Sequence, residues 1–110
     1  MTDKRTIRGE KYDIAAVVDN AIATVDAGTL DTEAARGYLM RAGHTNPAEE
    51  LINTVARDAA ILNLMTRMTG ASFNGQIGKI SFANRDRAIE QVDAYLNRRN
   101  AGHRAQWGKR

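Results

Sequence analysis

The sequence predicts an all-α protein in which about four helices form a small bundle around a long central helix at residues 46–69. That stretch contains no glycine, its proline stands at the first helical position, and it has the densest apolar content of the chain. The core must be aliphatic, because aromatic residues make up only 5% of the chain while hydrophobic residues make up 43%. Aliphatic side chains at helical spacing are typical of closely packed helices.

Length and composition predict a single domain. A chain of 110 residues is long enough for one hydrophobic core but not for two. We expect a flexible basic arm at residues 1–11, one helical domain at 12–98, and a mobile basic tail at 99–110. The chain has no cysteine, no apolar run typical of a signal peptide and no stretch long enough to span a membrane. We therefore expect a cytoplasmic protein without membrane contact.

The first predicted helix covers residues 14–27. Its apolar residues, from Ile14 to Val25, recur at intervals of three and four, which places them on one face. Asp13 can cap its N-terminus and Gly28 ends it.

The second predicted helix begins after Thr29 or Asp31 and runs to Ala42. Either residue can act as its N-cap, and Gly43 ends it. It is short enough to be marginal alone, so it must pack on the long helix. Its predicted inner face consists of Ala34, Ala35, Tyr38, Leu39 and Ala42.

The long third helix has a well-marked start in the sequence. Asn46 can cap it, Pro47 stands where its missing N–H costs nothing, and Glu49 occupies the acidic position of a capping box. Gly70 ends it.

Residues 70–83 predict an irregular, glycine-containing loop. A small hairpin around the Asn74-Gly75 pair is one alternative, but two strands without a larger sheet are rarely stable. We prefer an ordered loop whose apolar residues enter the helical core: Phe73, Ile77, Ile80 and Phe82.

The last predicted helix begins at Ser81 or Asn84 and ends near Asn97. Its apolar stripe consists of Ala88, Ile89, Val92, Tyr95 and Leu96.

The second half of the long helix is more apolar than one packed face requires. The residues that cover it can belong to the same chain or to a second subunit, and methionines suit adaptable contact surfaces. One hypothesis is therefore a helical protein-interaction module such as an adaptor, inhibitor or assembly factor, or a homodimer. Its candidate interface residues are Ile61, Leu64, Met65 and Met68.

Charge is unevenly distributed along the chain. Residues 1–12 carry four basic and two acidic residues, residues 13–70 carry four and eight, and residues 71–110 carry eight and three. Basic ends favour nucleic acid as a partner, because Lys and Arg beside phosphates release counterions. The alternative is that the basic ends only improve solubility.

The lead hypothesis is a small non-enzymatic protein that binds nucleic acid through its basic C-terminal third, with help from the N-terminal arm. Arginines would contact phosphate, and the only tryptophan would stack on an exposed base. The candidate binding residues are Lys79, Arg85, Arg87, Arg98, Arg99, Arg104 and Trp107.

Other sites fit the sequence poorly. A DNA-reading helix-turn-helix around Gly43 would present Glu49 and Glu50 to the phosphates. His44 has no second ligand at metal-binding spacing, and we interpret it as a residue that bonds the last carbonyls of its helix.

The glycines before Lys79 also fail the phosphate-loop pattern, because Phe73 and Ile80 occupy positions where glycine and Ser or Thr are needed. No residue pattern indicates a nucleophile, an acid–base pair or a metal site. We expect no enzymatic activity, no catalytic residues and no cofactor.

Overall fold

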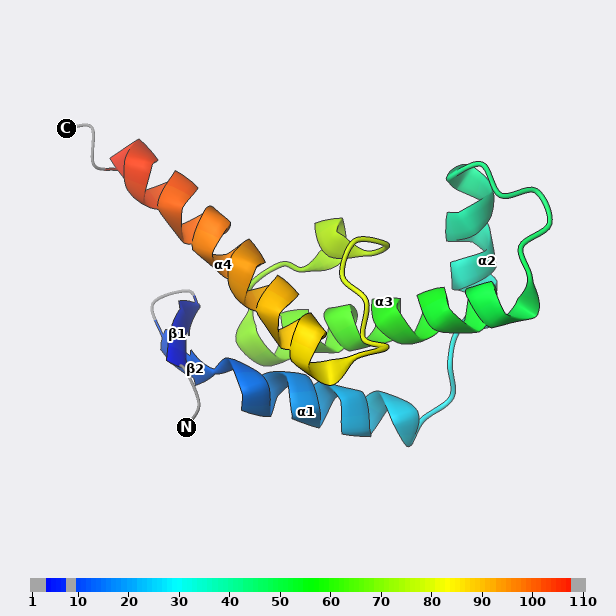
Figure 1. Cartoon of the computed structure of the whole chain (residues 1–110), viewed down its shortest axis with the longest axis horizontal. Coiled ribbons are helices and arrows are strands. Elements are labelled where there is room, and N and C mark those ends of the chain that lie inside the picture. The colour runs from blue at the N-terminus through cyan, green and yellow to red at the C-terminus, as the bar shows by residue number, and fades with distance from the viewer. Residues whose placement is uncertain (1–3, 8–9, 108–110) are drawn as a thin grey trace.

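The computed structural model describes residues 4–7 and 10–107, with side-chain surroundings described for residues 12–98. The elements in chain order are β1 (Lys4–Ile7), β2 (Glu10–Asp13), α1 (Ile14–Asp26), α2 (Thr32–Arg41), α3 (Glu49–Thr69), the 3-10 helix η1 (Asn74–Gln76) and α4 (Arg85–Trp107). The all-α prediction is confirmed. Helices α1 and α3 run side by side, α2 stands at one end of the molecule, and α4 extends towards the other end (Figure 1).

The main hydrophobic core lies between α1, the second half of α3, the loop after it and the first half of α4. Its apolar residues on α1 and α4 follow the three- and four-residue spacing of the sequence. The buried residues are Ile14, Val17, Val18, Ala21, Ile61, Leu62, Met65, Ala71, Phe73, Ile80, Phe82, Ala88, Val92 and Leu96.

A second, smaller cluster holds α2 against the first half of α3. It contains the buried residues Ala35, Leu39, Ile52 and Ala56. We call α2 and the part of α3 that carries Ile52 and Ala56 the α2 lobe. Tyr38 ties the lobe to the loop, because its hydroxyl donates to the Ile77 carbonyl at 2.7 Å.

Two helix ends match their predicted signals. Asp13 accepts a hydrogen bond from the Ala16 amide at 3.2 Å, and Asp31 accepts one from Ala34 at 3.0 Å. Asp31, and not Thr29, therefore caps α2.

Gly43 ends α2 at φ 104°, with the amides of Gly43 and His44 donating back to the carbonyls of Met40 and Leu39. At this helix end the backbone amide of His44 bonds a carbonyl of the last turn, a role that the sequence analysis assigned to the His44 side chain.

The predicted start of α3 is wrong by three residues. The helix begins at Glu49 after Ala48, which has extended backbone angles and no side-chain capping bond. Asn46 and Pro47 belong to the connection from α2 instead. The end is as predicted, since Gly70 adopts a left-handed φ of 77° and its amide donates to the Thr66 carbonyl.

The loop between α3 and α4 is ordered, as predicted, and contains a 3-10 turn where a hairpin was the alternative. Hydrogen bonds from the flanking helices hold its backbone. The Phe73 amide donates to Thr66 Oγ1 at 3.0 Å, and Tyr95 donates to the Ser72 carbonyl at 2.8 Å. Phe73 is fully buried and packs against the ring of Tyr95, with centroids 5.4 Å apart.

The two ends of the chain differ from the prediction. Residues 4–7 and 10–13 form an antiparallel hairpin in which Arg5 pairs with Tyr12, so most of the predicted arm is a β-ribbon. Helix α4 begins after Asn84, which caps the Arg87 amide at 3.1 Å, and continues to Trp107. The predicted tail from residue 99 is therefore helical as far as Trp107, and residues 1–3, 8–9 and 108–110 lie outside the described part.

Candidate nucleic-acid interface

The two basic segments of the chain lie at the same end of the molecule. Strand β1 contacts α4, and strand β2 leads directly into α1, so the hairpin is held beside the last helix. Figure 1 shows the hairpin and the C-terminal half of α4 at the end opposite α2. We call the hairpin together with residues 97–107 of α4 the basic end, and residues 14–96 the body.

The basic end has an excess of positive charge. Its described segments contain six basic residues and two acidic ones. Of the two acids, Asp13 caps α1. The outer part of α4 contributes three arginines and no acid. The basic residues are Lys4, Arg5, Lys11, Arg98, Arg99 and Arg104.

Helix α4 has two unlike halves. The inner half buries Ala88, Val92 and Leu96, which follow each other at four-residue intervals. Beyond Leu96 the same face of the helix continues through Arg99 and His103. The apolar stripe therefore stops at Leu96, and the last eleven residues of the helix carry no hydrophobic stripe that would need a core.

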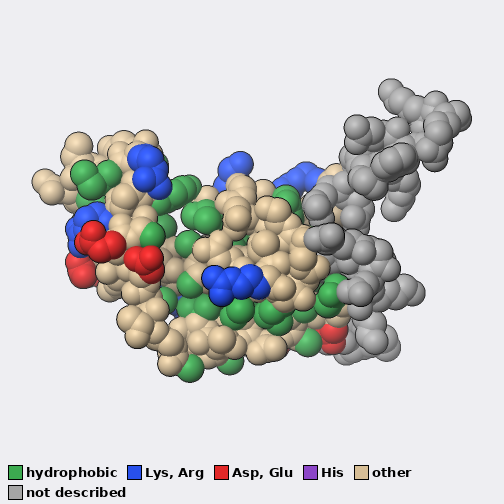
Figure 2. Space-filling view, turned by 180° about the vertical axis from the view of Figure 1, so that it is seen from behind, with side chains coloured by type: hydrophobic (Ala, Val, Ile, Leu, Met, Phe, Trp, Pro, Cys, Tyr) green, Lys and Arg blue, Asp and Glu red, His purple; other side chains and the backbone are tan. Residues whose placement is uncertain are grey.

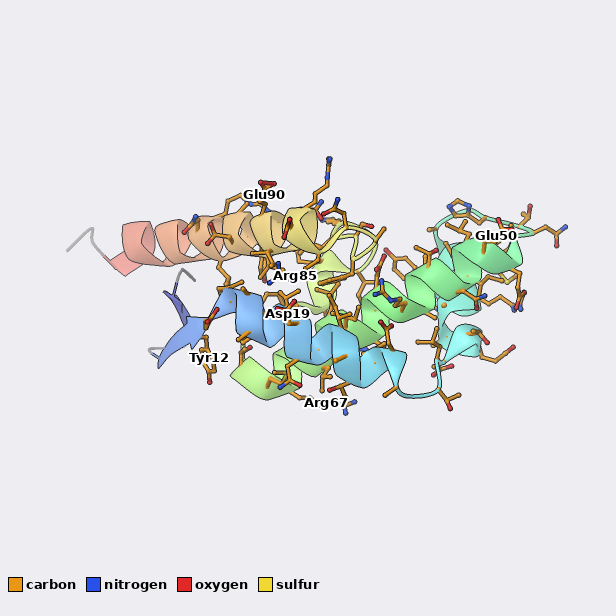
Figure 3. The ribbon with its side chains drawn as sticks, turned by 60° about the horizontal axis from the view of Figure 1, so that its bottom comes forward. Tyr12, Asp19, Glu50, Arg67, Arg85 and Glu90 are labelled. Atoms are coloured by element: carbon orange, nitrogen blue, oxygen red, sulfur yellow. The ribbon has the colours of Figure 1, made fainter. Side chains whose placement is uncertain are left out.

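Arg85, one of the predicted binding residues, is engaged within the body. Its guanidinium forms a two-pronged contact with Asp19 of α1, at 2.5 and 2.8 Å, and also contacts Asp86 at 2.9 Å. Figure 3 shows Arg85 and Asp19 meeting between α4 and α1. This hydrogen bond lowers the pKa of Asp19 against a small opposing effect of burial. Arg85 therefore joins two helices, and its charge is already neutralised by carboxylates, so it is poorly placed to bind a phosphate.

Arg57 performs a similar task about two turns further along α1. It contacts Asp26 at 2.9 Å and donates to the Phe82 carbonyl at 2.8 Å. The neighbouring Asp58 accepts the Phe82 amide at 3.0 Å, so two successive residues of α3 hold both backbone groups of Phe82. Burial raises the pKa of the Asp58 carboxyl, while the bond from Phe82 opposes this shift.

Three predicted binding residues have exposed side chains without a described acidic partner. These are Lys79 in the loop, Arg87 in the first turn of α4, and Arg98 near the basic end. Arg87 and Arg98 are eleven positions apart, which is about 16 Å along a helix. Only Arg98 belongs to the basic end. Lys79 lies in the loop and Arg87 in the first turn of α4, and neither belongs to the basic end.

The remaining predicted residues are Arg99, Arg104 and Trp107. Their backbone lies in the outer half of α4, and their side chains lie outside the described part. The structure thus groups Arg98, Arg99, Arg104 and Trp107 on one helical segment.

Sequence reasoning included the N-terminal arm in the hypothesis but named none of its basic residues as part of the site. Lys4, Arg5 and Lys11 lie on strands that are held close to α4. The hairpin itself was not predicted, because the segment has few apolar residues and no strong turn pair such as Asn-Gly.

The predicted partner interface on α3 is largely core. Ile61 and Met65 are 0% and 1% exposed, and Leu64 and Met68 pack partly buried against the same cluster. The excess apolarity of α3 is therefore covered by α1, α4 and the loop of the same chain. In this fold, Ile61 and Met65 have no surface that a partner could contact.

A separate cleft of about 250 Å³ lies between the α2 lobe and the loop. Figure 2 shows the surface hollowed there, with hydrophobic side chains on its floor. Tyr38 lines the cleft and Arg41 stands at the C-terminal end of the same helix. The complete lining is Asp31, Ala34, Ala35, Tyr38, Arg41, Val55, Ala56, Ala59, Ala60, Asn63 and Ile77.

The chemistry available elsewhere is limited. Among the described residues, no group of three His, Asp or Glu side chains is placed to hold a metal ion. No helix within the described ranges is long and apolar enough to cross a membrane.

Comparison with known proteins adds no function. No family model, curated protein or solved structure matches the chain. The assignment of a function therefore depends on geometry and charge alone.

Proposed function

We propose that this protein binds nucleic acid through its basic end, without catalysing a reaction. The observation that carries the proposal is the contact of β1 with α4, which places the two basic segments of the chain at the same end of the molecule. A cytoplasmic location is part of this proposal.

The distribution of ion pairs supports this choice of surface. Within the body, Arg57 and Arg85 are bonded to carboxylates of α1, and Arg36 lies 3.9 Å from Glu33. Arg98 has no carboxylate within 4 Å among the described residues. Arg98 can therefore bind phosphate without first breaking an internal ion pair, whereas Arg57 and Arg85 cannot.

The shape of the basic end also supports the proposal. A single helix projecting from the body can approach a phosphate backbone from more than one side. The hairpin beside it adds basic residues on a second element. Several phosphates can then be contacted at once, which makes affinity strongly dependent on salt.

The test is the affinity for a short fluorescently labelled oligonucleotide, measured by anisotropy at several salt concentrations. The logarithm of the association constant should fall steeply and linearly with the logarithm of salt concentration. Arg98→Gln should weaken binding and reduce the slope by about 0.9 if Arg98 contacts one phosphate. An affinity that does not change with salt would overturn the proposal.

Arg41→Gln is the matched control. Arg41 is an exposed arginine at the opposite end of the molecule, so the substitution changes net charge by the same amount. A local binding surface predicts a clear loss for Arg98→Gln and almost none for Arg41→Gln. Equal losses would mean that overall charge, and not the basic end, determines binding.

The second candidate function is a protein-interaction module, and the α2 lobe is the surface that favours it. Met40 and Leu51 are 55% and 37% exposed, and the cleft lies beside the same lobe. A homodimer is one form of this function. Sedimentation of the wild type and of a Met40→Gln variant at micromolar concentration tests it, since a monomer in both cases contradicts self-association through this lobe.

A further inference from the structure

We infer that the nucleic acid is double-stranded DNA, and that residues 97–107 of α4 enter its major groove as a helix. This inference rests on the proposed function and narrows it to one form of nucleic acid and one mode of contact.

The first argument is the reach of α4. Among the residues whose surroundings are described, Leu96 is the last buried one of the helix, and eleven residues follow it before the helix ends at Trp107. At about 1.5 Å per residue, this segment is about 16 Å long. In Figure 1 it extends away from the helices of the body. An α-helix is about 10–12 Å across, and the major groove of B-form DNA is about 12 Å wide, so the segment fits it in length and width.

The second argument is the chemistry of the segment. The chain has no acidic residue after Asp93. Beyond Leu96 the helix contains arginines and polar amide residues, which are the residue types that bond phosphates and the base edges of the groove. These residues are Asn97, Arg98, Arg99, Asn100, Arg104 and Gln106.

The third argument is the position of the hairpin. Because β1 contacts α4, a helix that lies in a groove brings the hairpin near the phosphates that border the groove. In this mode the strands that carry Lys4, Arg5 and Lys11 lie beside the DNA backbone, and phosphate contacts from them would position the helix without reading sequence.

The same geometry argues against double-stranded RNA. The major groove of A-form RNA is deep and narrow, and side chains cannot read it. Single strands are the main competitor, because arginines and Trp107 on an extended segment could track a backbone and stack on bases. The two modes differ in whether the segment must be helical when it binds.

Substitutions that change helix propensity but not charge distinguish duplex binding by a helix from single-strand binding by an extended segment. Gly102 lies within the segment, and a central glycine disfavours a helix relative to alanine. If the helix is the bound form, Gly102→Ala should strengthen duplex binding by up to about fivefold. Ala101→Gly should weaken duplex binding by a similar factor, and this second variant adds no atom that could clash with DNA. Neither position belongs to a core cluster of the described residues, so we expect the thermal unfolding of the body to stay unchanged.

The experiment compares three labelled probes of equal length: a DNA duplex, an RNA duplex and a single DNA strand. We expect the DNA duplex to bind most tightly and Ala101→Gly to weaken that binding. A single strand that binds as tightly as the duplex, or a duplex affinity unaffected by Ala101→Gly, would overturn this inference while leaving the proposed function in place. No salt-dependent binding to any probe would instead contradict the proposed function itself.

Discussion

The ion-paired arginines of the body and Arg98 of the basic end use the same charge in different ways. In the body, arginines neutralise carboxylates between helices: Arg85 joins α4 to α1, and Arg57 joins α3 to α1 and to the loop. At the basic end, Arg98 has no described acidic partner, and the helix after it has no acid at all. Arg57 and Arg85 therefore stabilise the fold, whereas Arg98 is available to a ligand.

This difference shows why a count of basic residues is a poor guide to a binding site. Arg85 and Arg98 belong to the same helix and looked equivalent in the sequence. Only the fold shows that Asp19 of a distant helix engages Arg85. If the comparison is correct, substitutions in the body should change stability and not binding, and substitutions at the basic end should do the reverse.

The largest expected effect is in the body, at Phe73. Phe73→Ala removes a fully buried ring from the main core and from its contact with Tyr95. We expect a loss of about 3–5 kcal/mol in the free energy of unfolding, measured by urea denaturation. Phe73→Leu keeps most of the volume and should cost clearly less. A loss below 1 kcal/mol for the alanine variant would mean that the loop is not part of the core.

An intermediate effect is expected at Asp58. Asp58→Ala leaves the buried Phe82 amide without its acceptor, which should cost about 1–3 kcal/mol. Asp58→Asn is the matched variant, because its amide oxygen can still accept that bond. The two variants together separate the hydrogen bond from the charge.

The difference in folding stability between Asp58→Asn and the wild type should change with pH in a defined direction. Burial raises the folded-state pKa of Asp58 above its ordinary value of 3.8, so protonation of this group favours the folded state. That contribution is fully present below pH 3.8 and is lost as pH rises through the raised pKa. The free energy of unfolding of the asparagine variant should therefore exceed that of the wild type by the largest amount at neutral pH. This difference should shrink as the solution is acidified. A difference that grows on acidification would contradict this account.

The smallest effect on stability is expected at Arg98. Arg98→Gln changes an exposed side chain without a described partner, so the free energy of unfolding should stay within about 0.5 kcal/mol of the wild type. Thermal denaturation checks this. A larger loss would mean that the basic end contributes to the fold, and the contrast between the two regions would fail.

The sequence predicted the helices well because their buried faces have a regular period. The spacing from Ile14 to Ala21 in α1, and from Ala88 to Leu96 in α4, placed each buried face correctly. The start of α3 was missed because Asn46 and Pro47 form a good local capping signal, which the connection from α2 overrides.

The candidate site was predictable only in part. The surplus of arginines after residue 97 is visible in the sequence, but the contact that brings the hairpin beside α4 depends on the tertiary fold. Ile61 and Met65, which the sequence analysis assigned to an interface, are buried in the chain's own core. A buried helix face has the same sequence pattern whether the residues that cover it come from the same chain or from a partner.

The most direct test of the central claim is to locate the nucleic-acid-binding surface of the protein by NMR of its backbone amides. The amide signals of isotopically labelled protein would be followed during titration with a short DNA duplex at low salt. We predict that the shifted amides concentrate in residues 4–13 and 97–107, and that those of the α2 lobe stay unchanged. Shifts centred on the α2 lobe, or spread evenly over the body, would contradict a binding surface at the basic end.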